Sequence, residues 1–584
     1  MNQFKVKSSL KSVIRFCIIL VFFFSSFTGY SQNNIPVPSV PQLRWQNYER
    51  VMFLHFAPNT WTGGFSDDSN PLSINRLNPT KLNTDQWCKV AKSWGAKMII
   101  FTSKHGGGFC WWQTNTTDYS VKNIPWKNGK GDVLAELAKS CDKYGLDMGI
   151  YIYPGSRSFG AGTGGLTKDP AKQEAYNKVF RQQLTEVLSK YKSMKEVWFD
   201  GGCEIGISDI LEKFAADAVI SQGPQATIRW VGNEKGIAPY PNWYTVKNKD
   251  LFIKSDYPPR NHQQGLVQSA TALRSDPDGD VYAPIETDLP LLQNQKTWRW
   301  FWTPNSDSLL LSLSDLMNVY YKSVGRGSVL VLNASPDTTG LIPKSHVALY
   351  KAFGKEIDRR FNKPIASVSG TGNILVIDLH KPMTINHAII SEDISQGQRV
   401  REFVLEGFSN GKWTELKNGS SIGSKRIEVF LPAVKVSRIR LHITQTLTTP
   451  VIQNFALYNI TNDNSINMAV TLRDWDTQTF STDWQDFSLD LTPYFVEKAE
   501  QFELKFLTID ADRKLSRGIE FKNWKIEING IPIPNIINKT GDWTFLINNS
   551  HNINKETPPQ VSFKTQIRTK PAKSIGTIEL KIIK

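Results

Sequence analysis

The feature that most constrains the fold is a repeated unit between about residues 45 and 335, in which a short apolar strand, a polar loop and a helical pattern follow one another. Near-continuous apolar runs are typical of parallel strands that are buried on both faces. Seven or eight such units in about 300 residues predict a (β/α)8-type barrel, with an open doubly wound sheet as the alternative. The predicted strands are 51–56 (VMFLHF), 96–102 (AKMIIFT), 146–153 (LDMGIYIY), 195–200 (KEVWFD), 226–231 (ATIRWV), 280–286 (DVYAPIE) and 327–333 (GSVLVLN).

Two of the helices between these strands have recognisable ends. The run TDQWCKVAKSWG is predicted to begin at a Thr84 cap and to end at Gly95. The run GDVLAELAKSCDKYG is predicted to begin at Asp132 and to end at Gly145. Such amphipathic helices are expected to cover the outside of the barrel.

The sequence pattern changes after about residue 360. Runs such as ILVIDLH, REFVLEGF, KRIEVFLP and SRIRLHI alternate apolar and polar residues between turns, which is typical of a β-sandwich. A chain of 584 residues is also longer than a single hydrophobic core supports. We therefore expect a multidomain protein, with a signal peptide at 1–31, a catalytic (β/α)8-like barrel at 32–360, a β-sandwich at 361–460 and a second β-rich domain at 461–584.

The N-terminus predicts export. The apolar run 16–24 (FCIILVFFF) is followed by small and polar residues and preceded by four cations, Lys5, Lys7, Lys11 and Arg15. This order is that of a cleavable signal peptide, hence of a periplasmic or secreted protein, and the run is too short to favour the alternative of a membrane anchor. Cleavage leaves a strongly basic chain, since the whole chain carries a formal net charge of +15. That charge favours anionic partners such as sulfated polysaccharide over nucleic acid, for which no motif is evident.

Polar residues stand at or just past the C-terminal end of most predicted strands. In a barrel these ends converge on one mouth, where active sites are built. Any one of the residues could be an ordinary loop residue, but their recurrence in phase with the strands predicts a single site. They are His55, Lys104 with His105, Asp200, Glu234, Glu286 and Asn333.

Asp200 in EVWFDGG is the most informative of these residues. It follows an apolar strand and precedes two glycines that let a ligand approach the backbone, and it could be a nucleophile, a metal ligand or a helix cap. A second carboxylate would come from Glu234 in RWVGNEKG or Glu286 in YAPIETD, unless these form ion pairs with neighbouring cations. Two carboxyls that flank one bond carry out glycoside hydrolysis. That chemistry needs no metal and no cofactor, and no cluster in the sequence resembles a catalytic metal site.

The run TSKHGGGFCWW, residues 102–112, could be a phosphate loop or part of a sugar site. No P-loop lysine or helix start follows the glycines at the spacing that phosphate binding requires. Trp111 and Trp112 instead favour sugar, because aromatic faces stack on sugar rings, although aromatic pairs also fill protein cores.

Six runs, in order from about residue 45 to 350, resemble family 29 of the glycoside hydrolases, the α-L-fucosidases. They are FLHFAPNTW, FTSKHGGGF, TTDYSVKNIPWKNGKGDVLAELAKSCDKYGLDMGIYI, EVWFDGG, RWVGNEKG and YYKSVGRGSVLVLNASPDTTGLI. The resemblance is closest to the branch that prefers α-1,3/1,4-linked fucose. The run EDISQGQRVREFVLEGFSNGKW resembles the discoidin-like sandwich that often follows the barrel in that branch.

The resemblance implies a retaining exo-glycosidase. Asp200 would attack the anomeric carbon, and Glu234 would protonate the leaving oxygen and then activate water, with Glu286 as the reserve acid/base. Side chains expected to contact the sugar are His55, His105, Trp111, Trp112, Tyr151, Trp198 and Glu286.

Two departures from the family pattern concern the substrate. The usual KHHDGF reads KHGGGF here, so that Gly106 and Gly107 replace a histidine and an aspartate. A glycine-rich run, 153–166, replaces a Trp-Asp-Arg-His run after the third strand. These changes remove groups that would hold sugar hydroxyls. They allow a substituted fucose, for which Arg157 and the positive charge suggest sulfate, or an L-galactose-like sugar, a sulfated fucan, or a decayed site that only binds glycan.

Overall fold

The computed structural model describes residues 35–64, 73–191, 193–231, 234–248, 275–294, 297–461, 469–475, 480–492, 501–508, 519–532, 536–539, 543–548, 560–569 and 576–583. The predicted signal peptide, residues 1–31, lies outside these residues. Within them, no helix is both long enough and apolar enough to cross a membrane.

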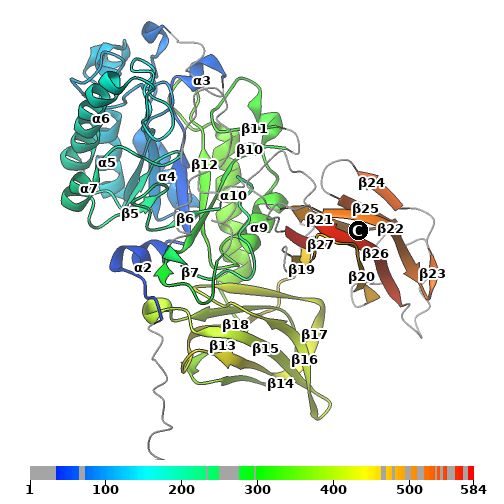
Figure 1. Ribbon diagram of the computed structural model, residues 1–584. Coiled ribbons are helices and arrows are strands. Elements are labelled where there is room, and N and C mark those ends of the chain that lie inside the picture. The colour runs from blue at the N-terminus through cyan, green and yellow to red at the C-terminus, as the bar shows by residue number, and fades with distance from the viewer. Residues whose placement is uncertain are drawn as a thin grey trace, which may run out of the picture. The chain divides into compact units, whose positions relative to one another are not determined.

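The first part of the described chain is a nearly closed parallel barrel (Figure 1). The strand order is β5-β4-β3-β2-β1-β12-β9-β6, and a parallel bridge between Ser221 and Ile228 joins its two ends. The prediction of a (β/α)8-type barrel is confirmed, and the alternative of an open sheet is wrong. The eight strands are β1 (Arg50–Leu54), β2 (Met98–Lys104), β3 (Asp147–Ile152), β4 (Glu196–Trp198), β5 (Val219–Ser221), β6 (Arg229–Trp230), β9 (Ile285–Pro290) and β12 (Val329–Ala334).

Two strands of the barrel differ from the prediction. The short β5 was not predicted, because three residues leave too little pattern to recognise. The segment 280–286 is not one strand. Its first half is β8 (Val281–Tyr282), which pairs with β7 (Thr245–Val246) outside the barrel, and β9 begins only after Pro284. Proline has no N–H to donate to a sheet, so it separates the two strands.

Helices cover the outside of the barrel (Figure 1). The cap of α4 is Asn83, whose side chain accepts the N–H of Gln86, and not Thr84 as predicted. Asp132 and Gly145 bound α5 as predicted, with Gly145 in the left-handed region at φ 60°. The helices are α2 (Val40–Gln46), α3 (Asn59–Thr62), α4 (Thr84–Ser93), α5 (Val133–Tyr144), α6 (Pro170–Lys190), α7 (Ser208–Phe214), α9 (Leu313–Lys322) and α10 (Lys344–Phe361).

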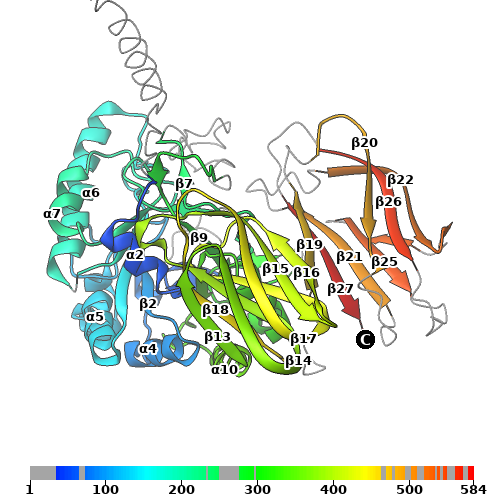
Figure 2. The same cartoon turned by 90° about the horizontal axis from the view of Figure 1, so that it is seen from below.

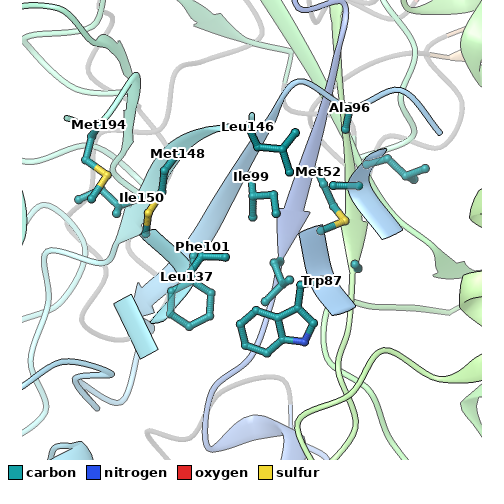
Figure 3. Packing of buried hydrophobic residues seen from close by; sticks show 14 of the residues in the cluster. Met52, Trp87, Ala96, Ile99, Phe101, Leu137, Leu146, Met148, Ile150 and Met194 are labelled. Atoms are coloured by element: carbon teal, nitrogen blue, oxygen red, sulfur yellow. The ribbon is translucent and has the colours of Figure 1, made fainter. Parts of the chain in front are cut away.

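Side chains that alternate along the strands build two separate hydrophobic layers. Met52, Ile99 and Phe101 face outward and pack with helix residues such as Trp87 and Leu137 (Figure 3). The intervening residues face the barrel axis and form a second cluster, which includes Val51, Phe53, Ile100, Tyr151, Trp198 and Val331. Alternation therefore decides whether a strand residue supports the fold or reaches the inside of the barrel.

The chain after α10 forms a six-stranded antiparallel sheet with its own core (Figure 2). The runs KRIEVFLP and SRIRLHI belong to one long strand, β17, rather than two. The loop between two of its strands contacts the barrel, because the Ser424 N–H donates to the Tyr244 hydroxyl and the Asn242 N–H donates to the Ser421 hydroxyl. Its strands are β13 (Ala366–Thr371), β14 (Ile374–Glu392), β15 (Val400–Ser409), β16 (Lys412–Gly419), β17 (Arg426–Thr446) and β18 (Val451–Tyr458).

The C-terminal part contains two further antiparallel sheets that share one hydrophobic cluster. One sheet is β19 (Ala469–Trp475), β27 (Gly576–Ile583), β21 (Gln501–Thr508), β25 (Trp543–Asn548) and β24 (Ile536–Lys539). The other is β20 (Gln485–Asp490), β26 (Val561–Thr569), β22 (Ile519–Ile528) and β23 (Ile531–Pro532). The expectation of β-sandwich domains after the barrel is confirmed.

Candidate active site

Asp200 lies directly after β4, at the C-terminal mouth of the barrel. The Tyr151 hydroxyl of β3 donates a 2.7 Å hydrogen bond to Asp200 Oδ2. Burial raises the pKa of Asp200, and the hydrogen bond from Tyr151 opposes that rise. Asp200 is therefore a carboxylate held by the Tyr151 hydroxyl, in a site where its charge is poorly solvated.

The turn after Asp200 is fixed by close packing. Gly201 has φ 75°, and a Cβ built on it would lie 2.1 Å from Thr163 Cγ2, so only glycine fits. The Gly201 N–H donates to Gln222 Oε1 at 2.9 Å, and Gln222 is fully buried after β5. Thr163 belongs to the glycine-rich run 153–166, which therefore packs against the turn that carries Asp200.

A continuous aromatic wall lies beside this carboxylate. The Tyr151 ring stacks on Trp198 with centroids 5.4 Å apart and, on the other side, on His105 with centroids 5.7 Å apart. Phe53 contacts both Tyr151 and Trp198 from the barrel interior. The structure thus brings together four of the predicted site residues: Asp200, Tyr151, Trp198 and His105.

His55 lies after β1 and joins the same wall. Its Nδ1 is 2.8 Å from Asn333 Oδ1, and Asn333 Nδ2 donates to the Trp300 carbonyl, so the amide oxygen must be the acceptor for a His55 Nδ1–H. Burial lowers the pKa of His55 well below its ordinary value and that of His105 to about 4. Both rings are neutral at neutral pH, and this tautomer leaves His55 Nε2 as an acceptor.

Two further aromatic residues complete the mouth and were missed in the sequence. Trp300 lies 4.8 Å from His55, and Phe301 lies 4.8 Å from His105, both measured between ring centroids. The Trp300 indole N–H donates to Glu234 Oε2 at 3.1 Å. The aromatic run TWRWFWT, 297–303, could have indicated these residues, but it has no strand or helix pattern from which its position in the fold could be predicted.

Glu234 lies where the hydrogen-bond ladder between β6 and β9 is interrupted. The Arg229 and Val231 N–H groups donate to the carbonyls of Pro284 and Glu286, as in a regular parallel pair. The Gly236 N–H makes the next described ladder bond, to the Asp288 carbonyl, five residues after Val231 instead of two. Glu234 therefore stands on a bulge beside Asp288, with φ 45° in the left-handed region.

Glu286 was predicted to lie at the end of its strand. This prediction is wrong, because β9 continues to Pro290. Glu286 is fully buried inside the barrel, where it accepts the Trp198 indole N–H at 2.7 Å and a hydrogen bond from Ser221. Burial and the neighbouring Glu196 raise the pKa of Glu286 well above its ordinary value. Its direct contacts support the floor of the site through Trp198.

The barrel matches the family model for α-L-fucosidases over residues 42–359. The chain belongs to the α-L-fucosidase family. It is 30% identical to Alpha-L-fucosidase 1 of Arabidopsis thaliana over an alignment of 502 positions that covers 76% of this chain and 94% of that protein.

Solved structures of this enzyme family agree. A glycoside hydrolase 29 family member from an unknown rumen bacterium is 27% identical, with a TM-score of 0.64 over 94% of this chain and 96% of its own. A Ruminococcus gnavus GH29 fucosidase in complex with fucose is 25% identical, with a TM-score of 0.63 over 73% of this chain and 96% of its own. The predicted membership of glycoside hydrolase family 29 is confirmed.

Three residues of the KHGGGF region lie away from the mouth. Trp111 stacks on Phe56 with centroids 4.8 Å apart, and the Trp112 indole donates to Glu186; both tryptophans are fully buried in the layer between strands and helices. Lys104 points into the same layer, where it donates to Tyr176 and Gln183, and burial lowers its pKa to about 8. In this fucosidase fold they pack the barrel wall behind His105.

Proposed function

We propose that this chain is an exported, retaining exo-α-L-fucosidase in which Asp200 is the nucleophile and Glu234 the acid/base. The observation that carries the proposal is that two carboxylates from different strands reach one mouth, each with one hydrogen bond from an aromatic side chain, Tyr151 or Trp300. The fucose bound by the Ruminococcus gnavus fucosidase supports fucose as the sugar.

In the first step, the Asp200 carboxylate forms a bond to the anomeric carbon while the glycosidic C–O bond breaks, and Glu234 gives its proton to the departing oxygen. In the second step, Glu234 takes a proton from water, which displaces Asp200 and retains the anomeric configuration. The Tyr151 hydroxyl orients the nucleophilic oxygen pair and stabilises its charge. The Trp300 indole N–H holds the Glu234 carboxyl in one direction.

We assign the sugar-contacting surface to the aromatic wall that surrounds these carboxylates. Aromatic faces suit the ring and methyl group of a deoxy sugar. A neutral His55 that accepts at Nε2 suits a sugar hydroxyl, which is itself a donor. The wall is formed by His55, His105, Tyr151, Trp198, Trp300 and Phe301.

A substituted or related sugar is the second candidate substrate, because of the glycines beside His105. A Cβ on Gly108 would lie 3.9 Å from Ser156 Oγ, so the glycine-rich run 153–166 borders KHGGGF. Small and hydroxyl-bearing side chains there leave room for a substituent, and the exposed Arg157 could pair with sulfate. A panel of aryl fucoside, aryl L-galactoside and sulfated fuco-oligosaccharides tests this; equal or better turnover of the plain fucoside would refute it.

The proposed roles are tested by Asp200→Ala and Glu234→Ala. Each is expected to lower kcat/KM on an aryl α-L-fucoside by several orders of magnitude, and azide is expected to rescue Glu234→Ala by replacing water in the second step. Glu286→Ala is the matched carboxylate control and is not expected to be rescued by azide. Unchanged activity in Asp200→Ala, or azide rescue of Glu286→Ala instead, would refute the assignment. N-terminal sequencing of the exported protein tests cleavage near residue 31.

A further inference from the structure

The bulge that carries Glu234 ends at a hydrogen bond to Asp288, a third carboxylate that the mechanism does not use. Asp288 lies on β9 two residues beyond Glu286, and side chains two apart on a strand point to the same side, here the barrel interior. Its side chain is 2% exposed. The Gly236 N–H donates to the Asp288 carbonyl, which anchors the far end of the bulge directly at this residue.

The surroundings of Asp288 supply few groups to neutralise it. Its Oδ1 is buried and has no hydrogen-bond partner among the residues that the structure describes. The charged groups that act on it are Glu234 across the bulge and Glu286 on its own strand, both acidic. The neighbouring strands contribute the uncharged Trp230 on β6 and Val331 on β12.

Carboxyl groups that lie close together in a buried site do not all ionise, because each negative charge raises the pKa of the others. Burial, followed by the charge of Glu234, raises the pKa of Asp288 well above its ordinary value. The interaction is mutual, so a single proton shared by the two carboxyls is held more tightly than either carboxyl would hold it alone. A general acid must carry its proton before the substrate binds, and an isolated glutamic acid would lose it at neutral pH.

We propose that Asp288 is a positioning residue that retains the catalytic proton at the site by sharing it with Glu234. This inference rests on the proposed fucosidase function. The Glu234–Asp288 pair shares a proton across the bulge, and the pair releases it at a higher pH than an isolated carboxyl would. The bulge brings the two residues together, because five residues separate Val231 from Gly236 where a regular ladder would need two, and Glu234 is one of the additional residues.

The test is the pH dependence of kcat/KM in Asp288→Asn, which keeps the shape and removes the charge. Two aryl α-L-fucosides are compared: the phenyl fucoside, whose departure needs a proton, and the 2,4-dinitrophenyl fucoside, whose departure does not. With the phenyl fucoside, the alkaline limb is expected to move to lower pH by about one unit or more, and activity at pH 8 to fall about tenfold or more. With the dinitrophenyl fucoside, activity is expected to stay within about threefold of wild type.

Three controls make the outcome decisive. Asp288→Glu keeps the charge and is expected to keep the alkaline limb, and Glu212→Gln makes the same chemical change at an exposed site on α7 and is expected to shift nothing. Thermal unfolding checks that each variant folds, and Asp288→Thr replaces Asp288→Asn if the latter does not. An unshifted alkaline limb, or an equal loss with both substrates, overturns the role of Asp288. Wild-type failure to cleave either fucoside instead overturns the proposed function.

Discussion

Replacing Tyr151 by phenylalanine isolates one hydroxyl group at the proposed nucleophile, Asp200. That hydroxyl donates to Asp200 Oδ2 at 2.7 Å, while the ring stacks on Trp198 and His105 and stays in place in the variant. A hydrogen bond to a charged group contributes about 1.5–3 kcal/mol. Since about 1.4 kcal/mol corresponds to a tenfold change in rate, we expect kcat/KM to fall about 10- to 150-fold.

The pH profile of Tyr151→Phe supplies a second, independent readout. As the proposed nucleophile, Asp200 must be ionised to attack; burial raises its pKa, and the Tyr151 hydrogen bond lowers it. Loss of the hydroxyl therefore raises the pKa further, and the acid limb of kcat/KM is expected to move to higher pH. The assay is release of the aryl group from an aryl α-L-fucoside between about pH 4 and 9.

Tyr244→Phe is the matched control, because its hydroxyl is also buried but donates to the Gly327 carbonyl away from the mouth. We expect it to lower the Tm and to leave the acid limb in place. If Tyr151→Phe kept full kcat/KM and an unchanged acid limb, Tyr151 would not hold the nucleophile and the reasoning would be refuted.

Three other substitutions test separate parts of the account. Trp300→Phe removes the indole donor of Glu234 and should lower kcat/KM about tenfold for poor leaving groups and much less for dinitrophenyl; equal losses would contradict it. Trp112→Ala should destabilise the fold by about 3–5 kcal/mol in thermal or denaturant unfolding with an unchanged KM, because the side chain is core; a raised KM with an unchanged Tm would show sugar contact instead. Burial raises the pKa of Glu392 from 4.5 to about 7, so ionisation of this carboxyl lowers the free energy of unfolding as the pH rises from 4.5 through about 7. Glu392→Gln should therefore stabilise the fold at pH 8 by on the order of 3 kcal/mol and change little at pH 4, and unfolding at the two pH values measures this.

The barrel could be predicted because its strands are buried on both faces and are therefore apolar at nearly every position. Strand β9 is the exception, and it explains the largest error in the predicted strands. In β9 the interior positions are Glu286 and Asp288, so IETDLP does not read as a buried strand, and the prediction ended it at Glu286. Polar residues inside a barrel pair with one another and with Trp198 or Ser221 from distant strands, which no local pattern reveals.

The positions of the candidate site residues in the fold could be predicted where a residue lies in or just after a strand, and only in part elsewhere. Asp200, His55 and Tyr151 lie where the strand pattern places them. Trp111 and Trp300 are both aromatic residues in loops, yet one packs against Phe56 behind the barrel wall and the other lies beside His55. Sequence gives the chemistry of these rings but not the side of the barrel on which they lie, because that depends on how each loop folds back.

The most direct test of the central claim is to trap the intermediate on the proposed nucleophile. A 2-deoxy-2-fluoro-L-fucosyl fluoride forms the glycosyl-enzyme bond and hydrolyses it slowly, so that proteolysis and mass spectrometry can locate the label. If Asp200 is the nucleophile, the wild type carries one fluorofucosyl group on Asp200 and the Asp200→Asn variant carries none. A label on Glu234, Glu286 or another carboxylate, or full activity without any label, would contradict it.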